Sequence, residues 1–461
     1  MKIAWVCLAM MSTFTLAFYC QGESVASDKQ PTGLRFTLAE AEAYALQNHP
    51  QIASAQLTAD AVRQEIRQAR SAFFPQIYGE STSVYAPYND NTGASTRLAA
   101  LGGLNNPTVY PRQSDGVVLN QLITDFGHTY DLTESAKFRA NAAHDRVEVA
   151  RAIVILAVDQ TYFNVLRAQA VLRVAQETVK TRQVALDQVS ALVRNKLKSI
   201  LDESFDQVAL SQAHLLLIQA QGGVREAEAA LSTALGFQDA QDFALAEMPM
   251  KLELPDSADN LIQMGLNKRP ELAALRHEAD AAQRFAQAQQ AAEYPKVTAL
   301  AAAGVSPVAD DKLLNHNYYA AGVNVEIPLA NGGNLDAKTQ EARLLKLAAD
   351  KDVIDAQNTI SRDIRVAWLN LKTDKERIGV TAELIKNAAE AQRLADARYR
   401  LGSSSIVEFN EAELNYTEAE LEDTTAKYDF QSARALLNFT IGNDFLASSS
   451  GEESLPQPTS P

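Results

Sequence analysis

Two pairs of carboxyl groups recur at one spacing in this chain and could act together. Glu408 and Glu411 are three residues apart, as are Glu203 and Asp206, and this spacing puts both members of a pair on one face of a helix. The pairs are related by one offset, since 408 − 203 = 411 − 206 = 205. Clustered carboxylates attract cations and repel anions. The alternative is that they are ordinary solvated charges in a first helical turn, where the helix dipole favours acidic residues.

Patterns typical of enzymes and metal sites are missing from the sequence. The histidines are scattered, with no His-x-x-x-His spacing, and neither a Gly-x-x-x-x-Gly-Lys run nor a Gly-x-Ser-x-Gly elbow occurs. We therefore predict no catalytic residues, no cofactor and no metal. The scattered histidines are His49, His128, His144, His214, His277 and His316.

Residues 1–26 have the pattern of a secretory signal peptide. A charged Lys2 precedes an apolar run, and Ser24-Val25-Ala26 provides a small-x-small cleavage site. An N-terminal membrane anchor is the alternative. The chain's cysteines, Cys7 and Cys20, both fall in this segment, so the mature chain would contain none. Cys20 could be a lipidated N-terminus, but the bulky Phe18-Tyr19 before it favours ordinary cleavage.

Charge and hydropathy exclude some classes of protein. The formal net charge of −15 and pI near 5.0 argue against nucleic-acid binding, which requires a basic face. Outside residues 1–26 no uninterrupted apolar run of about 18 residues occurs, so we predict no membrane-spanning helix. A membrane β-barrel remains possible, because its alternating strands are nearly invisible to hydropathy.

The chain is an internal duplication. Pro50 and Pro75 recur as Pro270 and Pro295, with 270 − 50 = 295 − 75 = 220. A second offset of 205 relates the turn at Gly127 to that at Gly332. An internal duplication means that the fold must be predicted for one repeat and then applied twice. We predict a first repeat at 27–245, a second at 246–446 and a disordered Ser-, Glu- and Pro-rich tail at 447–461.

Each repeat follows the order helix, β-hairpin, very long helix, helix. Strand patterns occupy residues 76–88, 116–123, 296–305 and 318–327. From 128 to 195 there is neither proline nor glycine, and from 335 to 401 only Gly379 interrupts, so each stretch predicts a rod of roughly 100 Å. Two shorter helices stacked end to end match one rod. The narrow, alanine-rich apolar stripes favour coiled coils in a thin wall, which one chain cannot close alone.

The sequence resembles the TolC-like outer-membrane factor family, because this order of elements occurs twice and is accompanied by matching local signatures. The local signatures are His49-Pro50 and Arg269-Pro270, Phe74-Pro75 and Tyr294-Pro295, Gly127 and Gly332-Gly333, and Tyr399-Arg400-Leu401-Gly402. The resemblance implies a mostly α chain with a membrane β-barrel: a homotrimer in which four strands per protomer complete a 12-stranded barrel and coiled-coil helices form a periplasmic α-barrel.

The resemblance also implies function and location. It implies a passive exit duct of an efflux pump or type I secretion system in the outer membrane of a Gram-negative bacterium. The partners would be outer-membrane lipid, a periplasmic adaptor and an inner-membrane pump of the RND or ABC type. A periplasmic coiled-coil adaptor or structural rod without a barrel is the alternative, although it leaves the two hairpins unexplained. The sequence does not specify the exported substrate.

Finally, the resemblance implies a gate at the helix tips, residues 195–200 and 402–405. Glu408 and Glu411 would form acidic constriction rings, with Glu203 and Asp206 as the counterparts in the first repeat. Tyr399 would bond to Glu203 and hold the end shut. Ser404 stands where the family can use a basic residue; either the lock is weaker, or Arg398, Arg400 or Lys198 substitutes. The turns that define the repeats are Pro50, Pro75, Gly127, Pro270, Pro295, Gly332 and Gly402.

Overall fold

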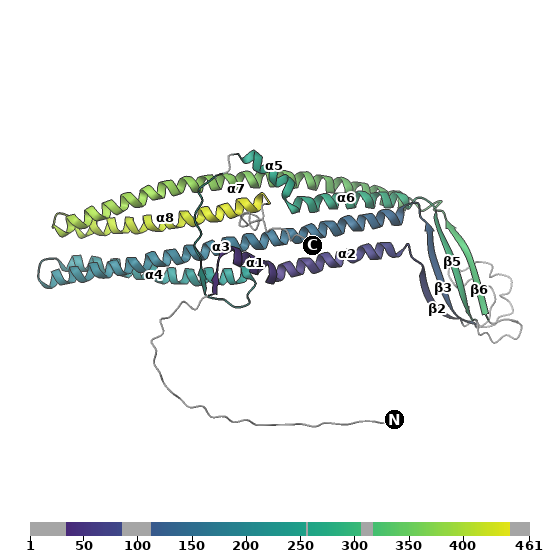
Figure 1. The fold of residues 1–461 in the computed structure, drawn as a ribbon, viewed down its shortest axis with the longest axis horizontal. Helices are drawn as coiled ribbons and strands as arrows, with labels where there is room; N and C mark the ends of the chain where they lie inside the picture. Colours follow the sequence, from purple (N-terminus) through teal and green to yellow (C-terminus); the bar gives the residue numbers. More distant parts are fainter. Residues whose placement is uncertain (1–33, 85–111, 255–256, 306–316, 443–461) are drawn as a thin grey trace, which may run out of the picture.

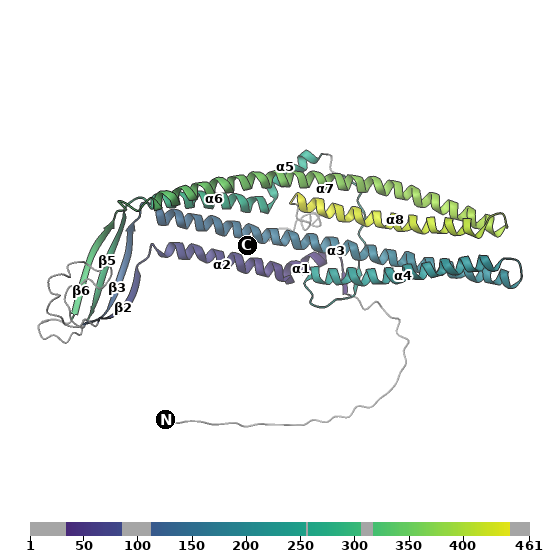
Figure 2. The same cartoon turned by 180° about the vertical axis from the view of Figure 1, so that it is seen from behind.

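The computed structural model describes residues 34–84, 112–254, 257–305 and 317–442. The predicted signal peptide and tail lie outside these ranges. The molecule is elongated: helices run along its long axis, a β-sheet occupies one end and two helical turns the other (Figures 1 and 2).

Both halves show the predicted order of elements. The first contains α1 (Leu38–Asn48), α2 (Pro50–Ser71), β2 (Gln76–Val84), β3 (Arg112–Thr124), α3 (His128–Arg194) and α4 (Ile200–Leu235). The second contains α5 (Ala258–Lys268), α6 (Pro270–Ala291), β5 (Lys296–Val305), β6 (Asn317–Glu326), α7 (Asn334–Arg400) and α8 (Ile406–Thr440).

Local chemistry explains where these helices begin and end. Thr37 and Glu40 form the predicted capping box at the start of α1. Pro50 and Pro270 occupy the first helical positions of α2 and α6, where a missing N–H costs nothing. Gly127 and Gly333 precede α3 and α7 with φ of 104° and 82°, a backbone conformation that favours glycine.

The helices form a curved layer around the long helix α3. Near the sheet, α3 lies between α2 and α6, and α7 follows α6. Near the tips, α3 packs against α4 and α8, and α7 packs against α8. The pairs α3–α4 and α7–α8 are visible as two hairpins in Figure 1. Helices α2 and α4 therefore form one edge of the layer and α7 forms the other.

The main sheet is antiparallel throughout, in the order β2-β3-β5-β6. Gln76 lies opposite Asn120 and Lys296 opposite Glu326. A register shift between Leu122 and Thr124 interrupts the β3–β5 pairing. Strands β2 and β6 have no partner on their outer sides in this sheet.

A second, smaller pairing was not predicted from the sequence. β1 (Leu34–Phe36) runs parallel to β4 (Phe243–Leu245), which joins the start of the described chain to the connection between the repeats. The Tyr162 hydroxyl lies against both segments, 3.2 Å from the Phe36 carbonyl oxygen and 2.7 Å from that of Ala246.

The two long-helix hairpins are related by 206 residues, which corrects the predicted offset of 205. Their turns match at this spacing: Lys196 (φ 61°) corresponds to Gly402 (φ 72°), because 196 + 206 = 402. The capping serines Ser199 and Ser405 agree, since 199 + 206 = 405. Burial agrees as well, because Val154, Val158 and the residues 206 later, Ile360 and Ile364, are all inaccessible. The extra residue lies before α7, at Gly332-Gly333.

Most of the apolar core lies halfway along the molecule. One cluster surrounds Val158 and Tyr162 and a second surrounds Ile364 and Phe430, so each repeat has a core of its own. Among the described residues, α3 alone is long and apolar enough to cross a bilayer, with a best-window mean hydropathy of 1.4. Since 44% of that window is buried inside the protein, it is equally typical of a core helix.

We expect Gly265→Ala to destabilise the second core. A Cβ at Gly265 would lie 2.3 Å from Cδ1 of Ile364, and overpacking of this kind costs about 1–3 kcal/mol. The equivalent positions of the first repeat hold Ala45 and Val158, since 45 + 220 = 265 and 158 + 206 = 364. The first repeat therefore has the larger residue on the short helix (Ala45), and the second repeat has it on the long helix (Ile364). Adding Ile364→Val should therefore recover most of the loss in thermal denaturation; equal losses in the single and double variants would contradict this packing.

Candidate gate at the helix tips

Two serine-capped turns form the tips. Ser199 caps α4 with its hydroxyl accepting from the Leu201 N–H, and Asp202 completes a capping box. Ser405 caps α8 in the same way, accepting from the Glu408 N–H at 3.2 Å. The Gly402 turn was predicted. Lys196 adopts the same left-handed conformation without being glycine.

Tyr399 lies at the centre of the contact between the tips. Its ring stacks on Phe409 with centroids 5.4 Å apart, and the Lys198 ammonium lies 3.9 Å from its centroid, so the first tip covers the second. Tyr399 is 7% exposed, and its hydroxyl has no hydrogen-bond partner among the described residues. Burial, followed by the charges of Asp202 and Asp206, raises the pKa of Tyr399 to about 12.

The predicted bond between Tyr399 and Glu203 is not formed. Glu203 instead accepts a hydrogen bond from Ser190 at 2.7 Å, within its own hairpin. The carboxyl groups whose charge acts on Tyr399 belong to Asp202 and Asp206. The corrected offset agrees, because the counterpart of Glu408 is Asp202 rather than Glu203 (202 + 206 = 408). Of the basic residues predicted as substitutes, Lys198 is the one that contacts Tyr399.

A buried polar network joins the two hairpins, on the side of the turns that faces the β-sheet. Arg182 of α3 donates to Asn410 Oδ1 at 2.8 Å and lies 4.0 Å from Glu413 Oε2. Asn410 in turn donates to Asp206 Oδ1 at 3.1 Å. Gln392 of α7 donates to Glu413 at 2.7 Å. The network therefore joins α3, α4, α7 and α8.

The network encloses one cation among two carboxyl groups. Arg182, Asp206 and Glu413 are at most 6% exposed. Burial raises the pKa of Asp206, and the hydrogen bond from Asn410 and the charge of Arg182 oppose that rise. Burial lowers the pKa of Arg182, against the charges of Glu413 and Asp206. The prediction that Asp206 lines an aperture is thus corrected: this carboxyl group is enclosed between helices, and no residue of the described ranges donates to its Oδ2.

Glu408 and Glu411, by contrast, are exposed at the start of α8. Glu408 accepts from Arg398 at 2.6 Å and from the Ser404 hydroxyl at 2.9 Å. Arg398 therefore provides a cation near Glu408 on the tip where the family can place one at position 404. Glu411 has no ion pair within the described part of the chain. The pair remains available to line an opening.

The network residues Arg182, Asn410 and Glu413 were not identified from the sequence. Their seven-residue spacing from other buried positions could have indicated that two of them are buried. Buried residues recur every seven positions in α3 at Ala175, Arg182 and Val189. A charged residue at the middle of such a stripe requires a buried partner. Glu413 follows buried Ile406 by seven residues in the same way. A seven-residue pattern in both hairpins would have placed Arg182 and Glu413 at buried positions.

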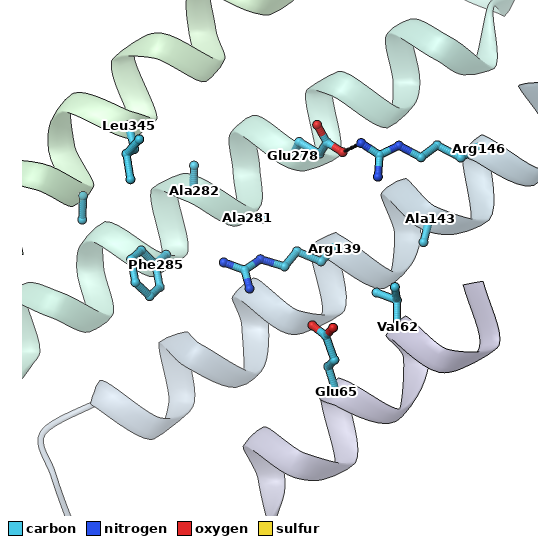
Figure 3. Close-up of a pocket in the computed structure, with 11 residues that line it drawn as sticks. Val62, Glu65, Arg139, Ala143, Arg146, Glu278, Ala281, Ala282, Phe285 and Leu345 are labelled. Carbon is cyan, nitrogen blue, oxygen red and sulfur yellow. Dashed lines mark hydrogen bonds and ion pairs between the residues drawn. The ribbon is translucent and has the colours of Figure 1, made fainter. Parts of the chain in front are cut away.

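A cleft lies in the other half of the helical layer, between α2, α3, α6 and α7 (Figure 3). Its volume is ≈ 400 Å³. Arg146 forms an ion pair with Glu278 across it, and the Arg139 guanidinium lies 5.8 Å from the Phe285 centroid. Both arginines project from one face of α3. The cleft is far from the tips along α3, so it does not contribute to the candidate gate.

A four-stranded sheet with open edges, continued by long paired helices that end in interlocked tips, defines a class of outer-membrane channel proteins. The model of the outer membrane efflux protein family matches residues 43–237 and 261–443, so the chain belongs to this family. The predicted family, fold class and outer-membrane location are confirmed, and the chain is an outer-membrane channel protein.

Known relatives match over most of their length. Outer membrane protein TolC of Vibrio cholerae is 25% identical over 88% of this chain and 90% of its own. The alkaline protease secretion protein AprF of Pseudomonas aeruginosa is 23% identical over 86% and 82%. A membrane protein structure from Pseudomonas aeruginosa superposes with a TM-score of 0.76 at 20% identity, covering 88% and 93%. The open state of the Neisseria gonorrhoeae MtrE channel gives 0.72 at 19%, covering 88% and 89%.

Proposed function

We propose that three copies of this chain form a channel-tunnel, the passive exit duct of a tripartite efflux pump or type I secretion system. The observation that carries the proposal is the pair of open edges on β2 and β6. Unpaired strand edges cannot face lipid, so the sheet must close with other copies. Three sheets of four strands give the even number typical of such barrels.

The helical layer supports the same closure, because both of its edges carry apolar stripes. Exposed apolar residues recur at multiples of seven along α4, the first edge, and along α7, the second. Seven-residue repeats are the pattern of a coiled-coil seam. The α4 stripe is Leu201, Val208 and Leu215, and the α7 stripe is Val366, Val380 and Leu394, continued by the C-cap residue Leu401. We place α4 of one protomer against α7 of the next.

Within each protomer we assign residues 27–245 and 246–446 to the two repeats. The repeats differ at the tips, where Tyr399 corresponds to Val193 (193 + 206 = 399) and the buried carboxyl group of Asp206 to Ala412. We infer that this difference serves gating. The α7–α8 hairpin swings away from α3 and α4 when the network around Arg182 and the Tyr399 stack separate.

The partners follow from what the relatives are named for. They include efflux pump outer membrane proteins of Pseudomonas putida and a protease secretion protein of Pseudomonas aeruginosa. We assign to this chain a periplasmic adaptor that docks at the tips and an inner-membrane pump. In this assignment the pump selects the cargo and supplies the energy for transport, and the channel is passive.

The assembly is tested first by location and oligomeric state. We expect the full-length protein in the outer-membrane fraction as a trimer that becomes monomeric on heating before electrophoresis. In planar bilayers it should conduct ions as discrete channels. A soluble periplasmic monomer without conductance would instead support the structural rod.

Neutralising the exposed acidic pair should change ion selectivity. In a trimer, Glu408 and Glu411 contribute six carboxylates to one aperture, and such rings attract cations. We expect the double variant Glu408→Gln/Glu411→Gln to lose much of its preference for potassium over chloride in reversal-potential measurements. Glu418→Gln, an exposed neutralisation further along α8, is the control. Unchanged selectivity would show that Glu408 and Glu411 are ordinary solvated charges in the first turn of α8.

A further inference from the structure

Two carboxyl side chains are buried together halfway along the molecule, far from the tips. Glu42 of α1 is 2% exposed and Asp159 of α3 is 1% exposed. The two carboxyl groups lie close enough for a hydrogen bond, which can form only if one of them holds a proton. Their surroundings are apolar, since Ala41 and Val158 beside them belong to the core of the first repeat.

The charged groups around the pair do not balance two carboxylates. Arg434 of α8 is the cation whose charge acts on Asp159, and its guanidinium lies 3.5 Å from the Lys251 carbonyl oxygen. On α1, Glu40 is exposed and is used by the Thr37 cap. Among the residues that the structure describes, none donates a hydrogen bond to Oδ1 of Asp159. One arginine therefore faces two carboxyl groups.

Two other ionisable groups lie on the elements packed against this core. Tyr162 of α3 is neutral at physiological pH, because burial raises the pKa of its hydroxyl to about 12. Burial also raises the pKa of Glu228 on α4, which bonds to the Phe243 backbone. Neither group supplies a positive charge to the pair.

We propose that Glu42 and Asp159 share one proton at neutral pH, and that this proton clamps α1 onto α3. Two bare carboxylates in an apolar core cannot both ionise. With one proton, the remaining negative charge is matched by Arg434. Burial and the neighbouring Glu42 raise the pKa of Asp159 to about 9, and burial raises that of Glu42.

The fold does not require this pair, because the second repeat lacks it. Ile262 stands at the position of Glu42 (42 + 220 = 262) and exposed Arg365 at that of Asp159 (159 + 206 = 365). What distinguishes the first repeat is the β1–β4 pairing, to which Tyr162 bonds three residues after Asp159. Loss of the proton should loosen α1, β1 and the connection between the repeats together.

The sign of the pH dependence follows from the raised pKa. Between about pH 4 and about pH 9 the folded protein holds a proton that the unfolded chain has released. Stability therefore falls as pH rises through this window. One such proton changes the folding equilibrium by at most about tenfold per pH unit.

The test uses the full-length protein in detergent. Infrared spectra at neutral pH should contain the carbonyl band of a protonated carboxylic acid, and this band should disappear on titration to about pH 10. Asp159→Asn should remove it, as should Glu42→Gln, and either change should flatten the decrease of melting temperature with pH. Asp259→Asn, at an exposed carboxylate on α5, should alter neither readout.

The wild-type spectrum alone decides the outcome if the variants do not fold. Absence of the acid band at neutral pH would overturn the proposal, and so would a band that survives in Asp159→Asn. Channel conductance is measured separately, so its failure would leave the proton assignment intact.

Discussion

Replacement of Arg182 by alanine is expected to open the helix tips and to destabilise the hairpins. Arg182 is the cation facing two buried carboxyl groups, Asp206 and Glu413. Removing one member of a buried ion pair costs about 3–5 kcal/mol, because the remaining charge has neither bulk water nor an opposite charge to compensate it. Asp206 of α4 and Glu413 of α8 then repel each other, and the contact between the two hairpins is weakened. Single-channel conductance in planar bilayers should rise severalfold.

A second variant separates opening from general damage. Arg194→Ala removes an exposed arginine of α3 that, within the described ranges, bonds only to the Ser190 carbonyl group of its own helix, so conductance should not change. Adding Asp206→Asn and Glu413→Gln to Arg182→Ala removes the unpaired charges and should lower the conductance again. If Arg182→Ala conducts like the wild type, the network is structural support rather than a latch.

The second large effect is expected at the apolar edge of α7. Val380 is 68% exposed in the protomer and belongs to the seven-residue stripe that we place against the neighbouring α4. Val380→Asp would put a carboxylate into that seam, where desolvation costs several kcal/mol per ion. We expect loss of the heat-sensitive trimer band on electrophoresis and loss of conductance.

A matched change tests whether the position or the charge matters. Ala382 is exposed two residues further on, and positions i and i+2 of a helix do not share a face. Ala382→Asp adds the same charge and should leave the trimer intact. If both variants assemble normally, α7 does not form the seam.

The long elements could be predicted because their signals are long. The proline-free stretches predicted at 128–195 and 335–401 agree with α3 and α7 to within one residue at each end. Strand patterns with period two located β5 and β6 as closely. The short β1 and β4 escaped prediction, because three residues contain no periodicity and the pairing joins positions 34 and 243.

The candidate site was harder to predict than the fold, because it depends on single-residue register. A repeat offset in error by one residue moved the counterpart of Glu408 from Asp202 to Glu203. One residue is about 100° around a helix, which separates a side chain facing the other hairpin from one facing its own. Tyr399 lies between the tips, but it contacts Phe409 and Lys198 rather than Glu203, and its role in a gate stays a prediction. Helix caps and burial resolved the register.

The parallel pairing of β1 with β4 also sets an order on the folding of the first repeat. Residue 34 cannot be fixed until residue 243 has emerged, because Leu34 lies opposite Phe243. Contacts between positions so distant in sequence form slowly, since the intervening chain must lose its freedom first. We therefore expect the N-terminal strand to be the last part of its repeat to settle. During export, β1 would then stay unpaired while the long helices pack against each other.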